Sequence, residues 1–225
     1  MIKTILFDVF GTIIDTGDGS IKATEKILKA HHSNINPYDF YYNNFKPLCK
    51  SYYSKKRFYV EEEILTKTLS RIEKKFHLQD RSKKDVKHYL KSLTERKLFQ
   101  ETEEVLEKLS KKYVLIVASN TDKEPLLLNF KKLCIAKYFF AIYTSEDLQA
   151  YKPQKLFFKK ILKNIKYDKN EILFVGDTQD EDILGAKEMG IKTVWINRKN
   201  EVLKKGIPKP DHEASDLKGV LNYNF

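Results

Sequence analysis

The chain is expected to form an α/β protein built around a parallel sheet, because short apolar segments alternate with helical patterns along most of its length. Five segments have the composition of strands: 3–9, 113–118, 139–144, 172–175 and 193–196. They are almost continuously apolar and rich in β-branched or aromatic residues. This composition is typical of strands that are buried on both faces of a parallel sheet.

Helical patterns follow the strands, with apolar residues at spacings of three and four. They cover residues 102–111, 123–133, 153–165 and 180–189. Pro153 suits a helix start, and Gly190 suits the position just after a helix end. The alternation predicts right-handed crossovers and hence a Rossmann-like sheet of five main strands with helices on both faces.

One long stretch interrupts the alternation. Between the first strand and about residue 93 the sequence shows only helical patterns, at 20–30, 37–56, 61–76 and 83–98. We therefore expect two domains, an α/β core of residues 1–14 and 94–225 and an inserted helical subdomain of residues 15–93. The many aromatic residues of the insert are expected to fill a small helical core, with a few of them free to line a pocket.

The bulk composition is that of a globular protein. Of its 225 residues, 41% are apolar and 32% are charged. No apolar run approaches the roughly 20 residues of a membrane span. The apolar start of the chain meets Asp8 at once, which fits a buried strand and not a signal peptide. These features predict a cytoplasmic protein without a membrane partner.

The formal net charge of +11 admits two interpretations. A nucleic-acid partner is one. However, the lysines are spread over most of the expected helices, basic runs are only two or three residues long, and no nucleic-acid-binding motif is present. We therefore expect a lysine-rich solvated surface and no nucleic-acid partner, with a positive field that attracts a phosphorylated or carboxylate substrate. Nothing in the sequence marks an interface that would define an oligomeric state.

Polar side chains collect where the expected strands end. The first strand is followed by Asp8, Phe10, Gly11 and Thr12, the second by Ser119 and Asn120, the third at some distance by Lys152, and the fourth by Gly176, Asp177 and Asp182. Ligands of open parallel sheets bind outside the carboxyl ends of the strands. The sequence therefore predicts a site with several carboxylates, a hydroxyl group and a lysine at this edge.

These four segments, DVFGT, SN, YKP and GDTQDED, resemble the four motifs of the haloacid dehalogenase-like superfamily. The resemblance covers the whole chain, and it implies that the inserted helices form a cap. It also implies that Asp8 is the covalent nucleophile, which forms an aspartyl-phosphate that water then hydrolyses.

The same resemblance implies the other roles at the site. Mg²⁺ would bind the Asp8 carboxylate, the backbone carbonyl of Phe10, Asp177 and Asp182. Lys152 would neutralise the reacting groups. Ser119, with backbone N–H groups near Gly11 and Asn120, would hold the phosphoryl oxygens. Thr12 and Asn120 have a second interpretation, in which they only hold their turns in place.

Phe10 departs from the pattern of the family's phosphatases, which usually carry a second aspartate at this position as general acid. Such a group contributes roughly 10²–10⁴-fold to the rate. Three hypotheses follow: a magnesium-dependent phosphatase of small phosphorylated metabolites, a metal-independent 2-haloacid dehalogenase, or a non-catalytic member that binds a phosphorylated ligand or a partner. In family dehalogenases the first acidic position of the fourth motif is typically not an aspartate, so Asp177 favours the phosphatase.

Overall fold

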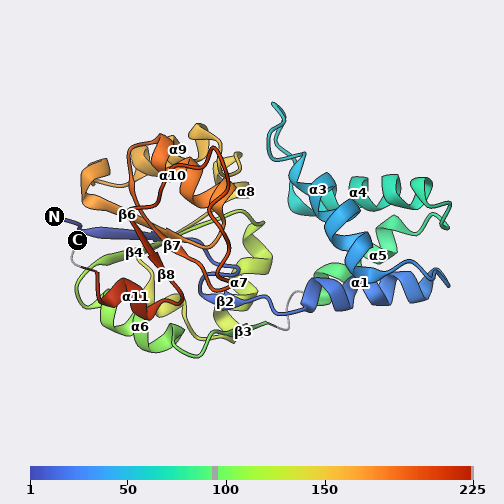
Figure 1. The fold of residues 1–225 in the computed structure, drawn as a ribbon, viewed down its shortest axis with the longest axis horizontal. Helices are drawn as coiled ribbons and strands as arrows, with labels where there is room; N and C mark the ends of the chain where they lie inside the picture. Colours follow the sequence, from blue (N-terminus) through green and yellow to red (C-terminus); the bar gives the residue numbers. More distant parts are fainter. Residues whose placement is uncertain (93–95, 224–225) are drawn as a thin grey trace. The chain divides into compact units, whose positions relative to one another are not determined.

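The computed structural model describes residues 1–92 and 96–223, which divide into two compact units (Figure 1). Unit 1 comprises Met1–Asp15 and Lys97–Phe225, and unit 2 comprises Thr16–Arg96. Asp15 thus belongs to unit 1, one residue beyond the expected first boundary. The expected second boundary, at residues 93 and 94, lies outside the described residues.

Unit 1 contains a sheet of six parallel strands in the order β5-β4-β1-β6-β7-β8. The strands are β1 (Thr4–Phe7), β4 (Val114–Ser119), β5 (Ala141–Thr144), β6 (Ile172–Gly176), β7 (Lys192–Ile196) and β8 (His212–Ala214). The first five match the expected segments. The edge strand β8 was not predicted, because its sequence, HEA, lacks the apolar run that marks a buried strand.

Helices cover both faces of this sheet (Figure 1). Side chains alternate along β1, so Ile5 and Phe7 enter one hydrophobic cluster and Leu6 enters the other. The first cluster includes residues of α6 (Thr102–Ser110), α7 (Lys123–Lys132) and the segment that leads into α11 (Lys218–Leu221). The second includes residues of α8 (Ser145–Leu148), α9 (Lys155–Asn164) and α10 (Leu184–Glu188).

The secondary structure described in unit 2 consists of helices. It contains α1 (Gly19–Ala30), α2 (Pro37–Asp39), a π-helical turn at Phe40–Phe45, α3 (Lys46–Lys50), α4 (Glu61–Lys75) and α5 (Ser82–Ser92). The helix expected at 37–56 is thus present from Pro37 to Lys50 with a π-helical turn in its middle, and it ends six residues early. Pro47 has no N–H group to continue the regular ladder, and Lys46 donates its N–H to the Tyr41 carbonyl five residues back.

The prediction that the last helix of unit 2 extends to residue 98 was wrong. Lys97–Leu98 does not continue α5 but forms β3, which pairs antiparallel with β2 (Ile14–Asp15) in a separate two-stranded sheet. The register pairs Asp15 with Lys97. The chain thus leaves and re-enters unit 1 at neighbouring positions. Among the described residues, no helix is long and apolar enough to cross a membrane.

Candidate active site

Three neighbouring strands deliver the site. Asp8 directly follows β1, Ser119 is the last residue of β4, and Asp177 directly follows β6. Since β4 and β6 pair with opposite sides of β1, the chain reverses its direction of travel across the sheet here. This is the point where the carboxyl ends of open α/β sheets form a ligand crevice.

Lys152 is the buried centre of the site. Its Nζ lies 2.7 Å from Oδ1 of Asp8 and 2.7 Å from Oδ1 of Asp182, and its side chain is fully buried. A buried ammonium group needs opposite charges close by, because its desolvation is costly. Burial would lower the pKa of Lys152, but Asp182 and Asp8 together raise it above its ordinary value. Lys152 is therefore a fixed positive charge beside Asp8.

The loop after β1 brings Asp8 next to Asp177. The Thr12 hydroxyl lies 3.0 Å from Oδ2 of Asp8 and 3.5 Å from Oδ1 of Asp177. Gly11 has a φ of +96°, and a Cβ atom at this position would lie 2.3 Å from Oδ2 of Asp177. Glycine is thus needed here both for its backbone conformation and for the space that the carboxylate takes.

Asp182 is held in a π-helical turn at Gln179–Ile183. Its Oδ2 accepts hydrogen bonds from the backbone N–H of Thr178 at 2.9 Å and from the Thr178 hydroxyl at 2.7 Å. A Cβ atom on Gly176 would lie 2.5 Å from this carboxylate. Gly176 therefore allows Asp182 to approach the end of β6 closely.

The site holds more negative than positive charge. One carboxylate oxygen from each of Asp8, Asp177 and Asp182 lies within 4.8 Å of the others, and Lys152 is the cation bound to two of them. Burial raises the pKa of Asp8, with a contribution from Asp182, and Lys152 opposes this. Burial also raises the pKa of Asp177 well above its ordinary value, and Asp8 and Asp182 add to the effect. Oxygen ligands with excess negative charge fit a hard divalent cation such as Mg²⁺.

Ser119 and Asn120 differ in how they are engaged. The Ser119 side chain is buried, and its hydroxyl has no hydrogen-bond partner among the described residues. The Asn120 side chain is bonded to the backbone of Lys152, accepting from its N–H at 2.8 Å and donating to its carbonyl at 3.1 Å. It also donates to Glu181 at 2.9 Å. The Asn120 side chain thus joins the loop after β4 to the backbone of Lys152, a contact that neither of its two expected roles included.

Phe10 lies at the position of the missing acid, and its side chain packs against the first hydrophobic cluster. The role predicted for its backbone carbonyl as a metal ligand stays a prediction. Within the described residues, the other predicted site residues lie at or after the ends of β1, β4, β5 and β6, with Ser119 in the last position of β4 and Asp182 in the π-helical turn.

Arg198 was not predicted as part of the site. It follows β7, and its guanidinium group donates to the carbonyl of Gly11 at 3.3 Å and to that of Thr12 at 2.9 Å. The same group pairs with Glu101 at 2.7 Å. Arg198 therefore holds the loop that carries Asp8. Its place two residues after the end of β7 was the signal that could have revealed it, because nearness to a strand end also identified Asp8 and Asp177.

Trp195 was also missed. Its indole N–H donates to the backbone carbonyl of Asp177 at 3.0 Å, which holds the loop after β6. Trp195 lies within β7 and is almost fully buried. In the sequence it is indistinguishable from an ordinary core residue of a strand.

Two relatives with functional names are similar to this chain over most of its length. PpaX of Caldanaerobacter subterraneus, which carries a provisional pyrophosphatase name, is 29% identical over 98% of this chain and 93% of its own. The pyrimidine 5'-nucleotidase PynA of Streptococcus pneumoniae is 28% identical over 87% of this chain and 84% of its own. Both relatives span both units.

Solved structures show the same fold. YfnB of Bacillus subtilis, provisionally named as a hydrolase and solved with bound magnesium, superimposes with a TM-score of 0.85 over 98% of this chain and 97% of its own, at 20% identity. An L-2-haloacid dehalogenase of Xanthobacter autotrophicus gives a TM-score of 0.83 over 99% and 98%, at 15% identity. The family of haloacid dehalogenase-like hydrolases matches residues 5–196. The chain therefore belongs to the haloacid dehalogenase-like hydrolase family.

Proposed function

We propose that this hydrolase is a magnesium-dependent phosphatase of small phosphorylated metabolites. The observation that carries the proposal is the carboxylate group of Asp177 beside Asp8 and Asp182, with Lys152 bound to two of the three. A carboxylate can displace a halide ion from carbon without the help of a metal. A phosphoryl group is itself anionic, so its attack by a carboxylate needs the additional positive charge that such a cluster can bind.

Asp8 is the nucleophile in this proposal. Its ionised oxygen attacks phosphorus, the leaving group departs, and water hydrolyses the resulting aspartyl-phosphate to regenerate the carboxylate. Lys152 keeps Asp8 ionised against the effect of burial and stabilises charge on the transferred group. The Ser119 hydroxyl donates to a phosphoryl oxygen, which would give this buried group its missing partner. Mg²⁺, when bound by Asp8, Asp177, Asp182 and the Phe10 carbonyl, supplies charge neutralisation between the two anions.

The relatives support a phosphate ester as substrate. PynA is named as a pyrimidine 5'-nucleotidase, and a rat protein that is 23% identical over 96% of this chain is named as an N-acylneuraminate-9-phosphatase. Both names are those of enzymes that act on small phosphorylated molecules. We propose that unit 2 is the cap and selects among such molecules.

A 2-haloacid dehalogenase is the second candidate, and Phe10 is the observation that favours it. Phenylalanine cannot protonate a leaving group, and halide leaves without protonation. Dehalogenases are among the proteins that share this fold, but at 15% identity this likeness concerns the fold alone.

A parallel assay separates the two candidates. We would measure phosphate release from a panel of nucleotides, sugar phosphates and acyl phosphates, with Mg²⁺ and with EDTA, and chloride release from 2-chloropropionate. We expect magnesium-dependent phosphate release and no chloride. Asp8→Asn should abolish this turnover because the amide is a poor nucleophile, while Glu107→Gln, at an exposed position of α6, should retain it.

Two outcomes would contradict the proposal. Metal-independent chloride release would assign the chain to the dehalogenases. Substantial phosphate release by folded Asp8→Asn protein, with native circular dichroism, would show that Asp8 is not the covalent nucleophile.

A further inference from the structure

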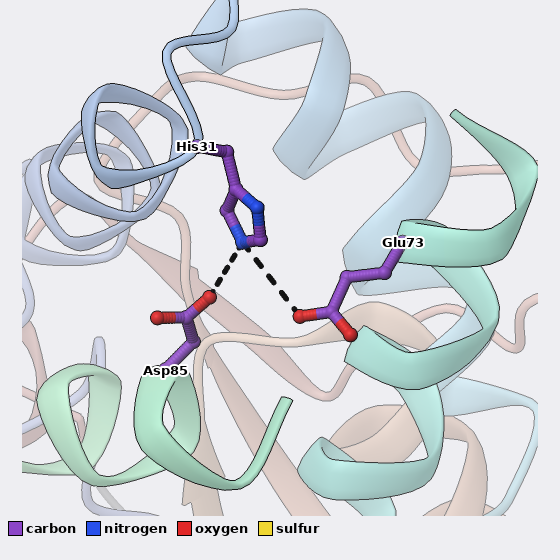
Figure 2. Close-up of side chains that lie close together, drawn as sticks. All are labelled: His31, Glu73 and Asp85. Carbon is purple, nitrogen blue, oxygen red and sulfur yellow. Dashed lines mark hydrogen bonds and ion pairs between the residues drawn. The ribbon is translucent and has the colours of Figure 1, made fainter. Parts of the chain in front are cut away.

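A second cluster of potential metal ligands lies within unit 2. His31 directly follows α1, Glu73 lies near the end of α4, and Asp85 lies in the first turn of α5. Their side chains point toward one another (Figure 2). Nε2 of His31 lies 2.7 Å from Oδ2 of Asp85 and 3.7 Å from Oε1 of Glu73. The three side chains are only 1%, 4% and 1% exposed, so the cluster is screened from water.

The polar groups of this cluster are incompletely satisfied. Oε2 of Glu73 is buried and has no hydrogen-bond partner among the described residues. Buried polar atoms without a partner are rare, and an ion or water is a common reason for them. Burial raises the pKa of Glu73 above its ordinary value. The other oxygen of Glu73, Oε1, accepts a hydrogen bond from the backbone N–H of Arg81 at 3.4 Å, so one of its two carboxylate oxygens lacks a partner.

Charge is also unbalanced. Two buried carboxylates face one another across His31, and Arg81 lies beside them. Its Nε lies 3.9 Å from Oδ1 of Asp85, and its Nη1 donates to the carbonyl of Ala30 at 2.8 Å. One guanidinium group cannot balance two carboxylates when His31 is neutral. A further positive charge is needed, either as a proton or as a metal ion.

We propose that His31, Glu73 and Asp85 bind a divalent transition-metal ion of the Zn²⁺ type. Zinc binds imidazole and carboxylate groups at about 2.0–2.2 Å, which places neighbouring ligand atoms of a tetrahedral site about 3.4 Å apart. The separations of 2.7 and 3.7 Å from Nε2 of His31 lie on either side of this value. One oxygen of each carboxylate and the imidazole nitrogen all lie within 4.8 Å of one another.

The donor set separates this site from the one at Asp8. Imidazole suits Zn²⁺ and its neighbours, whereas a site built from oxygen alone suits Mg²⁺. Arg81, which lies beside Asp85, also lines a surface cavity of about 840 Å³ together with Asp80, Ser82 and Arg71. A water molecule as fourth ligand would complete a tetrahedral site.

The bound metal would join three helices of a small unit. Thr16–Arg96 contains only 81 residues, and units of this size gain little stability from their hydrophobic core alone. A metal that ties the end of α1 to α4 and α5 would stabilise the unit independently of the reaction at Asp8.

The experiment uses the full chain, freed of metal and titrated with Zn²⁺ in a calorimeter, and with Co²⁺ as a spectroscopic probe. Tetrahedral Co²⁺ gives intense visible absorption, which octahedral Co²⁺ on oxygen ligands does not. We expect one site with a tetrahedral spectrum, and a midpoint of thermal unfolding that rises with Zn²⁺ concentration. His31→Asn should lose the spectrum and the rise. His88→Asn, at an exposed histidine of α5, should keep both, and so should Asp177→Asn.

Three results would overturn the proposal. They are the absence of Zn²⁺ binding by the folded wild-type chain, a tetrahedral site that survives in His31→Asn, and a site that is lost in Asp177→Asn. If His31→Asn does not fold, the wild-type Co²⁺ spectrum still decides, because a purely octahedral spectrum would show that Co²⁺ binds oxygen ligands elsewhere and not the His31 cluster.

Discussion

In the proposed mechanism, Phe10 limits which leaving groups can be expelled, because it cannot donate a proton. It lies two residues after Asp8, and its side chain packs against the core cluster that contains Phe7 and Val9. An aspartate at position 10 would therefore gain a proton donor near the nucleophile and lose apolar packing at the same time. These two effects need separate variants.

We expect Phe10→Asp to hydrolyse an alkyl phosphate faster than Phe10→Asn, by up to about 10²-fold, because only the acid can protonate the alkoxide. Both variants lose the same packing, so both should unfold at a lower temperature than the wild type. Steady-state rates and thermal unfolding of the two variants measure the two effects. Equal rates in both folded variants would show that the missing acid does not limit the reaction.

At the scale of single residues, Gly11 is constrained both by its backbone conformation and by the nearby Asp177 carboxylate. Its φ is +96°, and a Cβ atom would meet Asp177. Gly206 has a similar φ of +89°, and a Cβ atom there would meet nothing within 4 Å. The two glycines thus separate backbone strain from contact with the carboxylate.

Alanine at either glycine should lower the free energy of unfolding by about 1–3 kcal/mol through backbone strain. Only Gly11→Ala should also weaken Mg²⁺ binding, because it displaces Asp177. Denaturant unfolding and calorimetry with Mg²⁺ measure the two quantities. Unchanged Mg²⁺ affinity in Gly11→Ala would mean that Asp177 is not a ligand or that the loop gives way without moving it.

At the scale of elements, the loops after the strands are held by partners from distant parts of unit 1. Arg198, after β7, binds the carbonyls of Gly11 and Thr12, and Glu101, before α6, binds Arg198. Glu101 also accepts from the backbone N–H of Leu217 at 3.3 Å. The loop that carries Asp8 is therefore fixed from two further segments of the chain.

Arg198 is a positioning residue, and Arg198→Lys should lower kcat by up to about 10²-fold while KM changes little, because a displaced nucleophile still permits substrate binding. Lysine keeps the charge but cannot donate to two carbonyls and Glu101 at once. Arg57→Lys is the matched control, since Arg57 forms an exposed pair with Glu63. A loss in stability without a loss in kcat would assign Arg198 a structural role alone.

At the scale of the whole molecule, unit 1 is built from two chain segments on either side of unit 2 in the sequence, and these segments together form its hydrophobic core. Both hydrophobic clusters of the sheet consist of residues from unit 1. The two crossings of the chain meet at β2 and β3, where Asp15 pairs with Lys97. Unit 1 thus contains its own hydrophobic core, and the β2–β3 pairing within unit 1 joins the two points where the chain leaves and re-enters it.

Replacement of Thr16–Arg96 by a linker of about four Gly and Ser residues should leave a folded unit 1, because β2 and β3 already bring its ends together. We expect cooperative thermal unfolding and retained Mg²⁺ binding, measured by calorimetry, with reduced discrimination among phosphorylated substrates. A product that aggregates or unfolds without cooperativity would show that unit 1 depends on unit 2.

The local pattern of residues was enough to predict five of the six strands of the main sheet and the edge at which the candidate site lies. Strands that are buried on both faces are largely apolar, so β1, β4, β6 and β7 were visible in the sequence. The edge strand β5 is half-buried over most of its length, and its short apolar and aromatic run was visible as well. The polar residues that end β1, β4 and β6 stand out against these runs. Asp8, Ser119 and Asp177 could therefore be placed at one edge before any contact was known.

Only the tertiary structure revealed the contacts that join residues far apart in the chain. Arg198 and Gly11 are separated by 187 residues, and His31 and Asp85 by 54. The bond from Asn120 to the backbone of Lys152 and the short edge strand β8 are of the same kind. Periodicity and composition report the local environment of a residue, namely whether it is buried and in which element. Which distant group meets it is decided by how the elements pack, and no local pattern contains that information.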